Sequence, residues 1–159
     1  MEADKLRIRC SSLGKIMTNP RSKSEVLSGT CRTYIKELFL MYEYDIVKEF
    51  WSRYTDKGIR VERDSIMLAN DVFDWKLTID DISGDQMYFK NEWINGATDV
   101  CTDHLLADVK SSWDGTTFPW FDTELQSKSN MWQMHGYMWL TGHEQAEVVY
   151  CLIDTPRGS

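Results

Sequence analysis

The chain has 159 residues, which is close to the usual size of one compact domain. Its composition, 42% hydrophobic and 27% charged with only 3 Pro, excludes collagen-like, disordered and low-complexity classes. The net charge of −7 is unevenly divided: residues 1–60 hold 12 Lys and Arg against 8 Asp and Glu, whereas residues 61–159 hold 6 against 17. This asymmetry indicates a basic binding surface joined to an acidic region, although a solvated acidic surface would give the same counts.

The first half of the chain is predicted to be mainly helical. A short helix is expected over Ser11–Met17, where two hydroxyl residues suit an N-cap, followed by a polar loop over Asn19–Ser24. The spacing of apolar residues predicts three longer helices, over Thr30–Tyr44, over Asp45–Tyr54 and from near Gly58 toward Val72.

The second half changes to strands. Alternating or aromatic-rich stretches predict them over Trp75–Ile79, Gln86–Ile94, Ala97–Cys101 and Leu105–Ser111. The dipeptide Asn95-Gly96 predicts a tight turn between the second and the third strand. A helix over 129–140, ended near Gly142, and a buried strand over 147–153 follow. This order predicts an α/β fold with a mixed sheet, in a single domain over residues 1–159.

Location and redox state also follow from the composition. No apolar run is long enough to cross a membrane, and residues 1–9 contain no secretory signal, so we expect a cytoplasmic protein without a membrane partner. The cysteines stand singly, without a C-x-x-C pair, and are expected to be free and mostly buried: Cys10, Cys31, Cys101 and Cys151.

Two carboxylates and a lysine form the strongest chemical pattern. Asp108 and Lys110 point to one face of a strand while Val109 points to the core, and the neighbouring strand can bring Asp99 beside Asp108. Adjacent carboxylates repel one another, and a hard divalent cation such as Mg²⁺ relieves that repulsion. A lysine beside the cation can orient water and offset charge. An exposed hairpin with alternating charges would show the same residues.

Further segments around this pattern resemble a known family. Asn95-Gly-Ala-Thr-Asp99 followed by Asp108-Val-Lys-Ser-Ser112 resembles the PD-(D/E)XK nuclease signature. The branch that contains lambda exonuclease and the YqaJ-type viral recombinases shares four more segments in the same order: Arg9-Cys-Ser-Ser-Leu-Gly-Lys-Ile16, Gly58-Ile-Arg-Val-Glu62, Trp132-Gln-Met-His-Gly-Tyr137 and Tyr150-Cys-Leu-Ile-Asp-Thr-Pro156. The resemblance implies a restriction-endonuclease-like core, with a mixed central sheet flanked by helices and a helical N-terminal half.

Two departures from the family pattern are visible. Thr98 stands where the family usually has Pro before the first Asp, a position that supplies no ligand. The chain ends at Ser159, where the family often continues with more helix, so we expect a minimal or C-terminally truncated member.

The resemblance assigns roles to individual residues. Asp99, Asp108, the backbone carbonyl of Val109 and Glu62 would hold the metal, Lys110 would position the water, and Gln133 would hold Lys110 or the scissile phosphate. Contacts to DNA are expected from Ser11, Ser12, Lys15, Arg32 and Tyr137. Glu62 taken alone would be interpreted as an ordinary solvated helix residue, and the apolar neighbours of Tyr137 also allow a core role for it. The aromatic residues after Lys110 are expected to be buried rather than exposed for base stacking: Trp113, Phe118, Trp120 and Phe121.

The resemblance implies a metal-dependent DNA exonuclease. It would use Mg²⁺, with Mn²⁺ as a substitute and two ions in the site, on duplex ends during phage-type recombination or repair. Its location would be the host cytoplasm if the chain is viral, and its partners a single-strand annealing protein and, in a ring trimer, further copies of the chain. The alternatives are an endonuclease or junction resolvase on the same core, and an inactive DNA- or protein-binding module.

Overall fold

Two compact units alternate along the chain. A computed structural model describes residues 6–47, 53–83, 86–112, 114–125 and 127–154, with the side chains of 53–60 and 83 outside the description. The first unit comprises Met1–Phe50, Tyr88–Gly96 and Gln126–Gly142, and the second comprises Trp51–Met87, Ala97–Leu125 and His143–Ser159.

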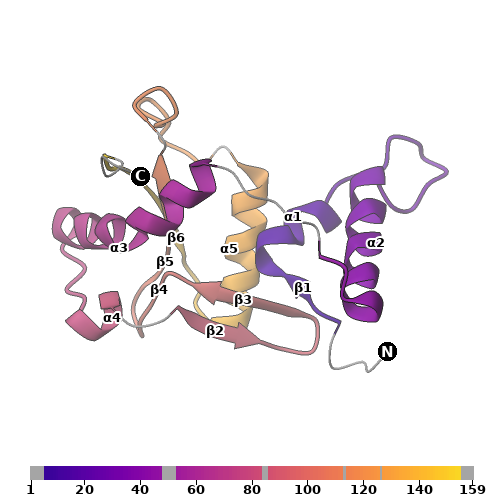
Figure 1. Cartoon of the computed structure of the whole chain (residues 1–159), viewed down its shortest axis with the longest axis horizontal. Helices are drawn as coiled ribbons and strands as arrows, with labels where there is room; N and C mark the ends of the chain where they lie inside the picture. The colour runs from indigo at the N-terminus through magenta and orange to yellow at the C-terminus, as the bar shows by residue number, and fades with distance from the viewer. Residues whose placement is uncertain (1–5, 48–52, 84–85, 113, 126, 155–159) are drawn as a thin grey trace. The chain divides into compact units, whose positions relative to one another are not determined.

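The first unit is built mainly from helices (Figure 1). Its short strand β1 (Ile8–Arg9) runs parallel to β3 (Ile94–Thr98) and leads through a 3-10 turn, Cys10–Ser12, into the short helix α1 (Leu13–Ile16). Helix α2 (Gly29–Tyr44) begins at Ser28, whose hydroxyl accepts a hydrogen bond from the Cys31 N–H. Helix α5 (Lys128–Thr141) packs against the 3-10 turn and α1, and it ends at Gly142 in the left-handed conformation.

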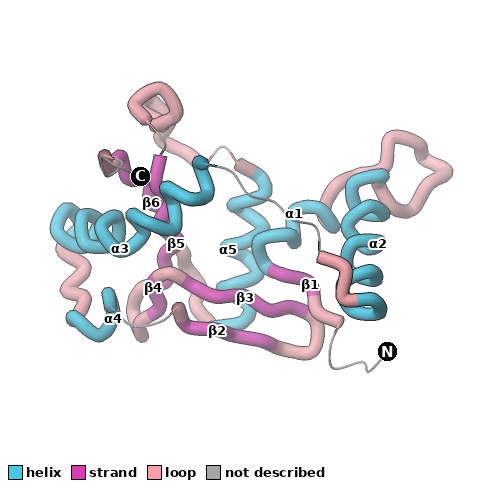
Figure 2. Tube along the Cα trace, in the orientation of Figure 1, coloured by secondary structure: helices cyan, strands magenta, loops and turns pink. Residues whose placement is uncertain are grey.

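The second unit places helix α3 (Arg53–Phe73) against a three-stranded sheet (Figures 1 and 2). Strand β4 (Val100–Cys101) is antiparallel to β5 (Leu106–Ser112), and β5 is parallel to β6 (Glu147–Leu152). Residues from the helix and all three strands form the core: Ile66, Ala69, Val100, Ala107, Val109, Val149 and Cys151. The other three-stranded sheet has the order β1-β3-β2, with β2 at Met87–Lys90, and most of its residues belong to the first unit. These mixed sheets and helices confirm the predicted α/β class and the helical N-terminal half.

The helix predicted over Asp45–Tyr54 is wrong at its start. Asp45 has a left-handed conformation (φ 54°) and caps the end of α2, where the Ile46 N–H donates to the Leu40 carbonyl. Residues 48–52 lie outside the described part of the chain, and Arg53 and Tyr54 belong to α3.

The strand predicted over Trp75–Ile79 is also wrong. Asp74 and Lys76 have positive φ angles of 51° and 57°, which an extended strand does not allow. Thr78 and Asp81 then form a reciprocal capping box, with N–H to side-chain oxygen distances of 2.8 and 3.1 Å, that starts the short helix α4 (Ile79–Ser83).

The predicted turn lies four residues earlier in the chain than expected. The side-chain oxygen of Asn91 accepts hydrogen bonds from the Trp93 and Ile94 N–H groups at 2.8 and 2.9 Å, which closes the turn between β2 and β3. Gly96 is instead inside β3, where a Cβ atom would lie 2.6 Å from Tyr137 Cε1 and 3.1 Å from Cys10 Sγ. A glycine is therefore needed here for close packing rather than for a turn.

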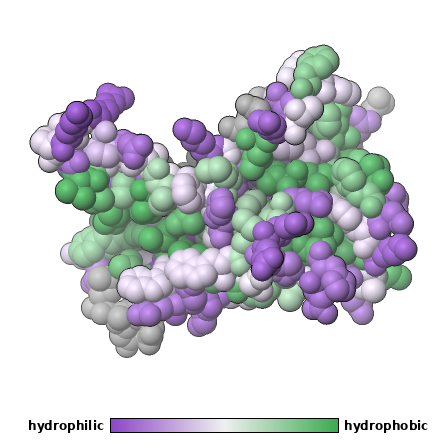
Figure 3. All heavy atoms as spheres, turned by 180° about the vertical axis from the view of Figure 1, so that it is seen from behind, coloured by the Kyte–Doolittle hydropathy of each residue, from purple (hydrophilic) through white to green (hydrophobic). Residues whose placement is uncertain are grey.

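Apolar side chains are common on the surface of both units. Figure 3 shows hydrophobic residues at the surface between hydrophilic ones, and α2 alone exposes Ile35, Phe39, Leu40 and Tyr44. No helix within the described ranges combines the length and the apolarity that a membrane crossing requires. All four cysteines are free, and three of them are buried.

Candidate active site

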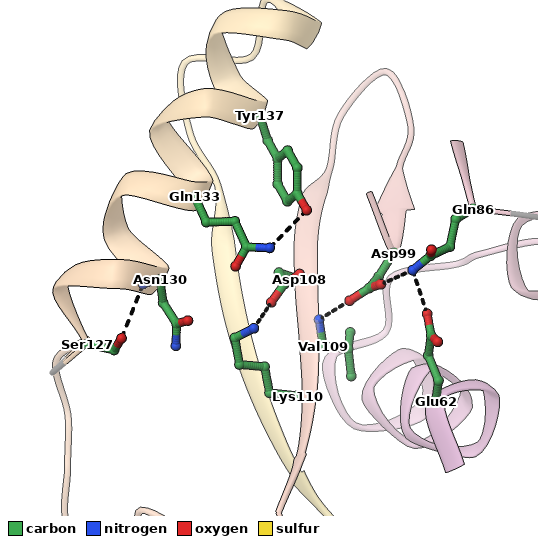
Figure 4. A network of polar contacts seen from close by, with 10 residues as sticks. All are labelled: Glu62, Gln86, Asp99, Asp108, Val109, Lys110, Ser127, Asn130, Gln133 and Tyr137. Carbon is green, nitrogen blue, oxygen red and sulfur yellow. Dashed lines mark hydrogen bonds and ion pairs between the residues drawn. The ribbon is translucent and has the colours of Figure 1, made fainter. Parts of the chain in front are cut away.

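The hairpin of β4 and β5 brings the two predicted aspartates together. Val100 pairs with Ala107 and Cys101 with Leu106, so this antiparallel register continues to Asp99 opposite Asp108. Asp99 lies in the bend between β3 and β4, and Asp108 lies inside β5. Figure 4 shows both carboxylates beside Val109, with Lys110 next to Asp108.

Asp108 is a buried carboxylate paired with a lysine. Only 5% of the residue is exposed, and its Oδ2 lies 2.7 Å from Lys110 Nζ. Among the described residues Oδ2 accepts no hydrogen bond of regular geometry, so the contact with Lys110 is a short ion pair whose angles are unfavourable. Burial raises the pKa of Asp108 above its usual range, the Lys110 ammonium opposes this rise, and the charge of Asp99 adds to it.

Asp99 is held by two donors, one to each oxygen. Its Oδ2 accepts a hydrogen bond from the Val109 N–H at 2.8 Å, and its Oδ1 accepts one from the Gln86 side-chain amide at 2.8 Å. Burial raises the pKa of Asp99, the Val109 N–H lowers it, and the neighbouring Glu62 carboxylate raises it further. The orientation of Asp99 is therefore fixed by the backbone of the strand that carries Asp108.

Helix α3 supplies the third carboxylate. Glu62 Oε1 accepts a hydrogen bond from Gln86 Nε2 at 2.9 Å, which links it to Asp99 (Figure 4). One turn further along α3, the fully buried Ser65 is hydrogen-bonded to Ser111 of β5, with 2.6 Å between the hydroxyl oxygens. This partly buried contact ties the helix to the strand and so fixes the side of the sheet on which Glu62 lies.

The three carboxylates supply oxygen atoms of the kind that a hard divalent cation binds, but their side chains do not converge on one point. Glu62 neighbours Asp99, and Asp99 neighbours Asp108, but no three acidic, imidazole or thiol side chains of the described residues form a ready-made metal site. The donors are the oxygen ligands that Mg²⁺ prefers. The buried Asp108 Oδ2, which lacks a regular hydrogen bond from the described residues, is the atom that a cation would satisfy best.

Gln133 and Tyr137 lie on α5, in the other unit. Gln133 Nε2 donates to the Tyr137 hydroxyl at 2.9 Å, as their spacing of four residues on one helix allows. Tyr137 is only 4% exposed, and its ring edge is next to Gly96. Tyr137 is therefore part of the core of the first unit, and its hydroxyl is the end that Gln133 orients.

The residues predicted to bind DNA lie mainly around α1 and α2. Ser12 and Lys15 line a surface pocket with Arg9, Tyr34 and Glu37. The Lys15 ammonium lies 5.3 Å from the centre of the Tyr34 ring. Ser11 and Arg32 are exposed, and Arg32 pairs with Glu25 at 3.4 Å. Ser12 occupies the N-cap position of α1, but its side chain makes no capping hydrogen bond.

The sequence does not predict the contacts of Gln86. Gln86 was predicted only as the first residue of a strand, and no spacing in the sequence marks it as a partner of two carboxylates.

The predicted burial of the aromatic residues after β5 is wrong for Trp120 and Phe121, which are 61% and 96% exposed. Phe118 is half-buried, and Trp113 lies outside the described residues.

Comparisons with known proteins identify relatives among solved structures. No protein-family model matches the chain, and no curated protein matches it. A phage-related exonuclease from Haemophilus somnus 129PT is 31% identical, with a TM-score of 0.81 over 96% of this chain and 70% of that chain. An alkaline exonuclease from Laribacter hongkongensis shares the fold at 14% identity, with a TM-score of 0.69 over 97% of this chain and 73% of that one. The chain therefore belongs to the PD-(D/E)XK nucleases, in the branch of lambda exonuclease and the YqaJ-type viral recombinases.

Proposed function

We propose that this nuclease is a Mg²⁺-dependent deoxyribonuclease that degrades DNA from duplex ends. The observation that carries the proposal is the buried Asp108 beside Asp99 and Lys110, with Glu62 linked to Asp99. The two structural relatives are both named exonucleases, and the first is described as phage-related, which supports end-directed cleavage in phage-type recombination or repair.

The cation would be held by Glu62, Asp99, Asp108 and the Val109 carbonyl. Mn²⁺ would substitute for Mg²⁺, and the site would bind two ions. When bound, Mg²⁺ would lower the pKa of a water molecule and stabilise charge on the phosphate oxygens. Lys110 supplies an ammonium group beside these carboxylates, and its ion pair with Asp108 holds it next to the proposed cation site. It would orient the attacking water and offset the charge that develops on the phosphate.

The remaining predicted roles concern the hold on DNA. Ser12 and Lys15 line one pocket, and Ser11 and Arg32 are exposed, so all four can meet a phosphate backbone. Gln133 would bind the scissile phosphate or Lys110, and Tyr137 would act through the hydroxyl that Gln133 contacts. A single-strand annealing protein and further copies of the chain remain the proposed protein partners.

An assay on two DNA forms tests this function. End-labelled linear duplex and covalently closed circular DNA are incubated with the protein in Mg²⁺ or in EDTA. We expect degradation of the linear form alone, and only in Mg²⁺. Nicking of the circle would instead indicate an endonuclease or junction resolvase, and binding of DNA without cleavage of either form would indicate an inactive binding module.

A further inference from the structure

One side-chain amide lies between two carboxylates that the proposed function assigns to the metal. Gln86 Nε2 donates to Glu62 Oε1 at 2.9 Å and to Asp99 Oδ1 at 2.8 Å, so both protons of one nitrogen are used (Figure 4). Gln86 directly precedes β2 and is itself exposed. Its amide can therefore leave the two carboxylates without disturbing a packed core.

The Gln86 amide offsets the repulsion between Glu62 and Asp99, which Lys110 does not offset. Glu62 and Asp99 are close enough to interact as like charges, and the ammonium of Lys110 is paired with Asp108 instead. Hydrogen bonds to carboxylates are stronger than bonds between neutral groups, because the acceptor carries a full charge. The two amide protons thus hold Glu62 and Asp99 next to each other.

A cation bound by Glu62 and Asp99 would lie close to the amide protons of Gln86. The partial positive charge of an amide N–H and a divalent cation repel one another, and both are attracted to the same carboxylate oxygens. We propose that the Gln86 amide competes with the cation for the carboxylates of Glu62 and Asp99. This inference rests on the proposed function, because it takes the two carboxylates to be metal ligands.

The competition predicts an effect opposite to that of an ordinary supporting residue. Removing a residue that merely preorganises the site would weaken metal binding. Removing a competitor frees both carboxylates, so binding should become tighter, while the protein without metal should become less stable because the repulsion is no longer offset. A gain of affinity therefore distinguishes the competing role from a structural one.

The test is a calorimetric Mn²⁺ titration of the full chain without DNA. Gln86→Met keeps the length of the side chain and removes both donors, and Gln86→Glu also adds a third negative charge. We expect affinity to rise about tenfold in Gln86→Met, and further in Gln86→Glu, which corresponds to about 1.4 kcal/mol for the first step. Thermal unfolding in EDTA should occur at a lower temperature in both variants. Gln145→Met, at another exposed glutamine of the same unit, should match the wild type.

The outcomes separate the two proposals. Wild-type protein that binds no Mn²⁺ would contradict the metal site itself, and with it this inference. Wild-type binding with equal or weaker binding in Gln86→Met and Gln86→Glu would overturn the competing role of Gln86 and leave the metal site intact.

Discussion

Asp108 is a charged residue in a part of β5 where both neighbours, Ala107 and Val109, are buried core residues. Burial of a carboxylate is unfavourable, and the ion pair with Lys110 offsets the penalty only in part, since the pKa of Asp108 is still raised. A second carboxylate at Asp99 adds repulsion. Such an arrangement lowers the stability of the fold and is explained best by a ligand that needs both charges.

The first prediction concerns the stability of Asp108→Asn. The pKa of Asp108 in the folded protein is raised above the ordinary 3.8. The protein therefore loses stability as the pH rises from 3.8 through the folded-state pKa, and the full penalty applies at higher pH. Asp108→Asn removes this term, so in EDTA its melting temperature at pH 8 should equal or exceed that of the wild type. The melting temperature of Asp108→Asn should also fall less between pH 4 and pH 8 than that of the wild type. A variant that melts well below the wild type at pH 8 would show that the charge is structural.

The second prediction separates the lysine from the metal ligands. Lys110 is a cation and cannot ligate another, so Lys110→Ala should reduce turnover by about 10²–10³-fold and change Mn²⁺ affinity by less than about tenfold. Single-turnover cleavage and calorimetry measure the two quantities on the same preparation. An equal loss of metal binding and turnover would contradict the role assigned to Lys110.

Elements with strong local signals could be predicted, and those decided by distant contacts could not. The helix predicted over Thr30–Tyr44 is found at Gly29–Tyr44, because the apolar spacing lies within the segment and the Ser28 cap directly precedes it. The turn at Asn91 was misplaced, because Asn95-Gly96 has the stronger turn composition, yet Gly96 is required by Tyr137 and Cys10. The neighbouring positions of Asp99 and Asp108 follow from a short hairpin, whereas the Gln86 contact joins segments that no local pattern links.

The third prediction tests the close packing at β3. In Gly96→Ala the new Cβ atom would lie 2.6 Å from Tyr137 Cε1, so the ring must shift, and the free energy of unfolding should fall by about 1–3 kcal/mol. Gly29→Ala is the matched control, since among the described residues no atom beyond its chain neighbours and its own helix backbone lies within 4 Å of the new Cβ, and helix α2 should gain about 0.4–1 kcal/mol. Urea denaturation measures both. Equal stability of Gly96→Ala and the wild type would contradict the packing described for Tyr137.

At the scale of the whole molecule, residues 1–60 carry an excess of positive charge and residues 61–159 an excess of negative charge. The positive excess of residues 1–60 includes Lys15, Arg21, Lys23 and Arg32, all of them exposed, whereas the carboxylates of the candidate site belong to the acidic remainder. DNA would be repelled by the acidic part except where a cation neutralises it. Metal and DNA should therefore each increase the affinity for the other.

The fourth prediction measures this division of charge. Reversing Lys15, Arg21, Lys23 and Arg32 together to Glu should weaken DNA binding and reduce the slope of log affinity against log salt by about 3 to 4, because fewer counterions are released. Lys76→Glu with Lys90→Glu, also at exposed positions, is the control and should leave the slope nearly unchanged. An unchanged slope in the fourfold variant would show that these cations serve solubility and that DNA is bound elsewhere.

Cleavage by Asp108→Asn decides most directly whether the paired carboxylates form the active site. Release of label from a linear duplex is followed for the wild type and the variant at equal concentration in Mg²⁺, after circular dichroism has shown both to be folded. The rate should fall about a thousandfold or more in Asp108→Asn, because metal ligation is worth several kcal/mol to the transition state, and wild-type cleavage should stop in EDTA. Cleavage by Asp108→Asn at the wild-type rate would place the active site elsewhere.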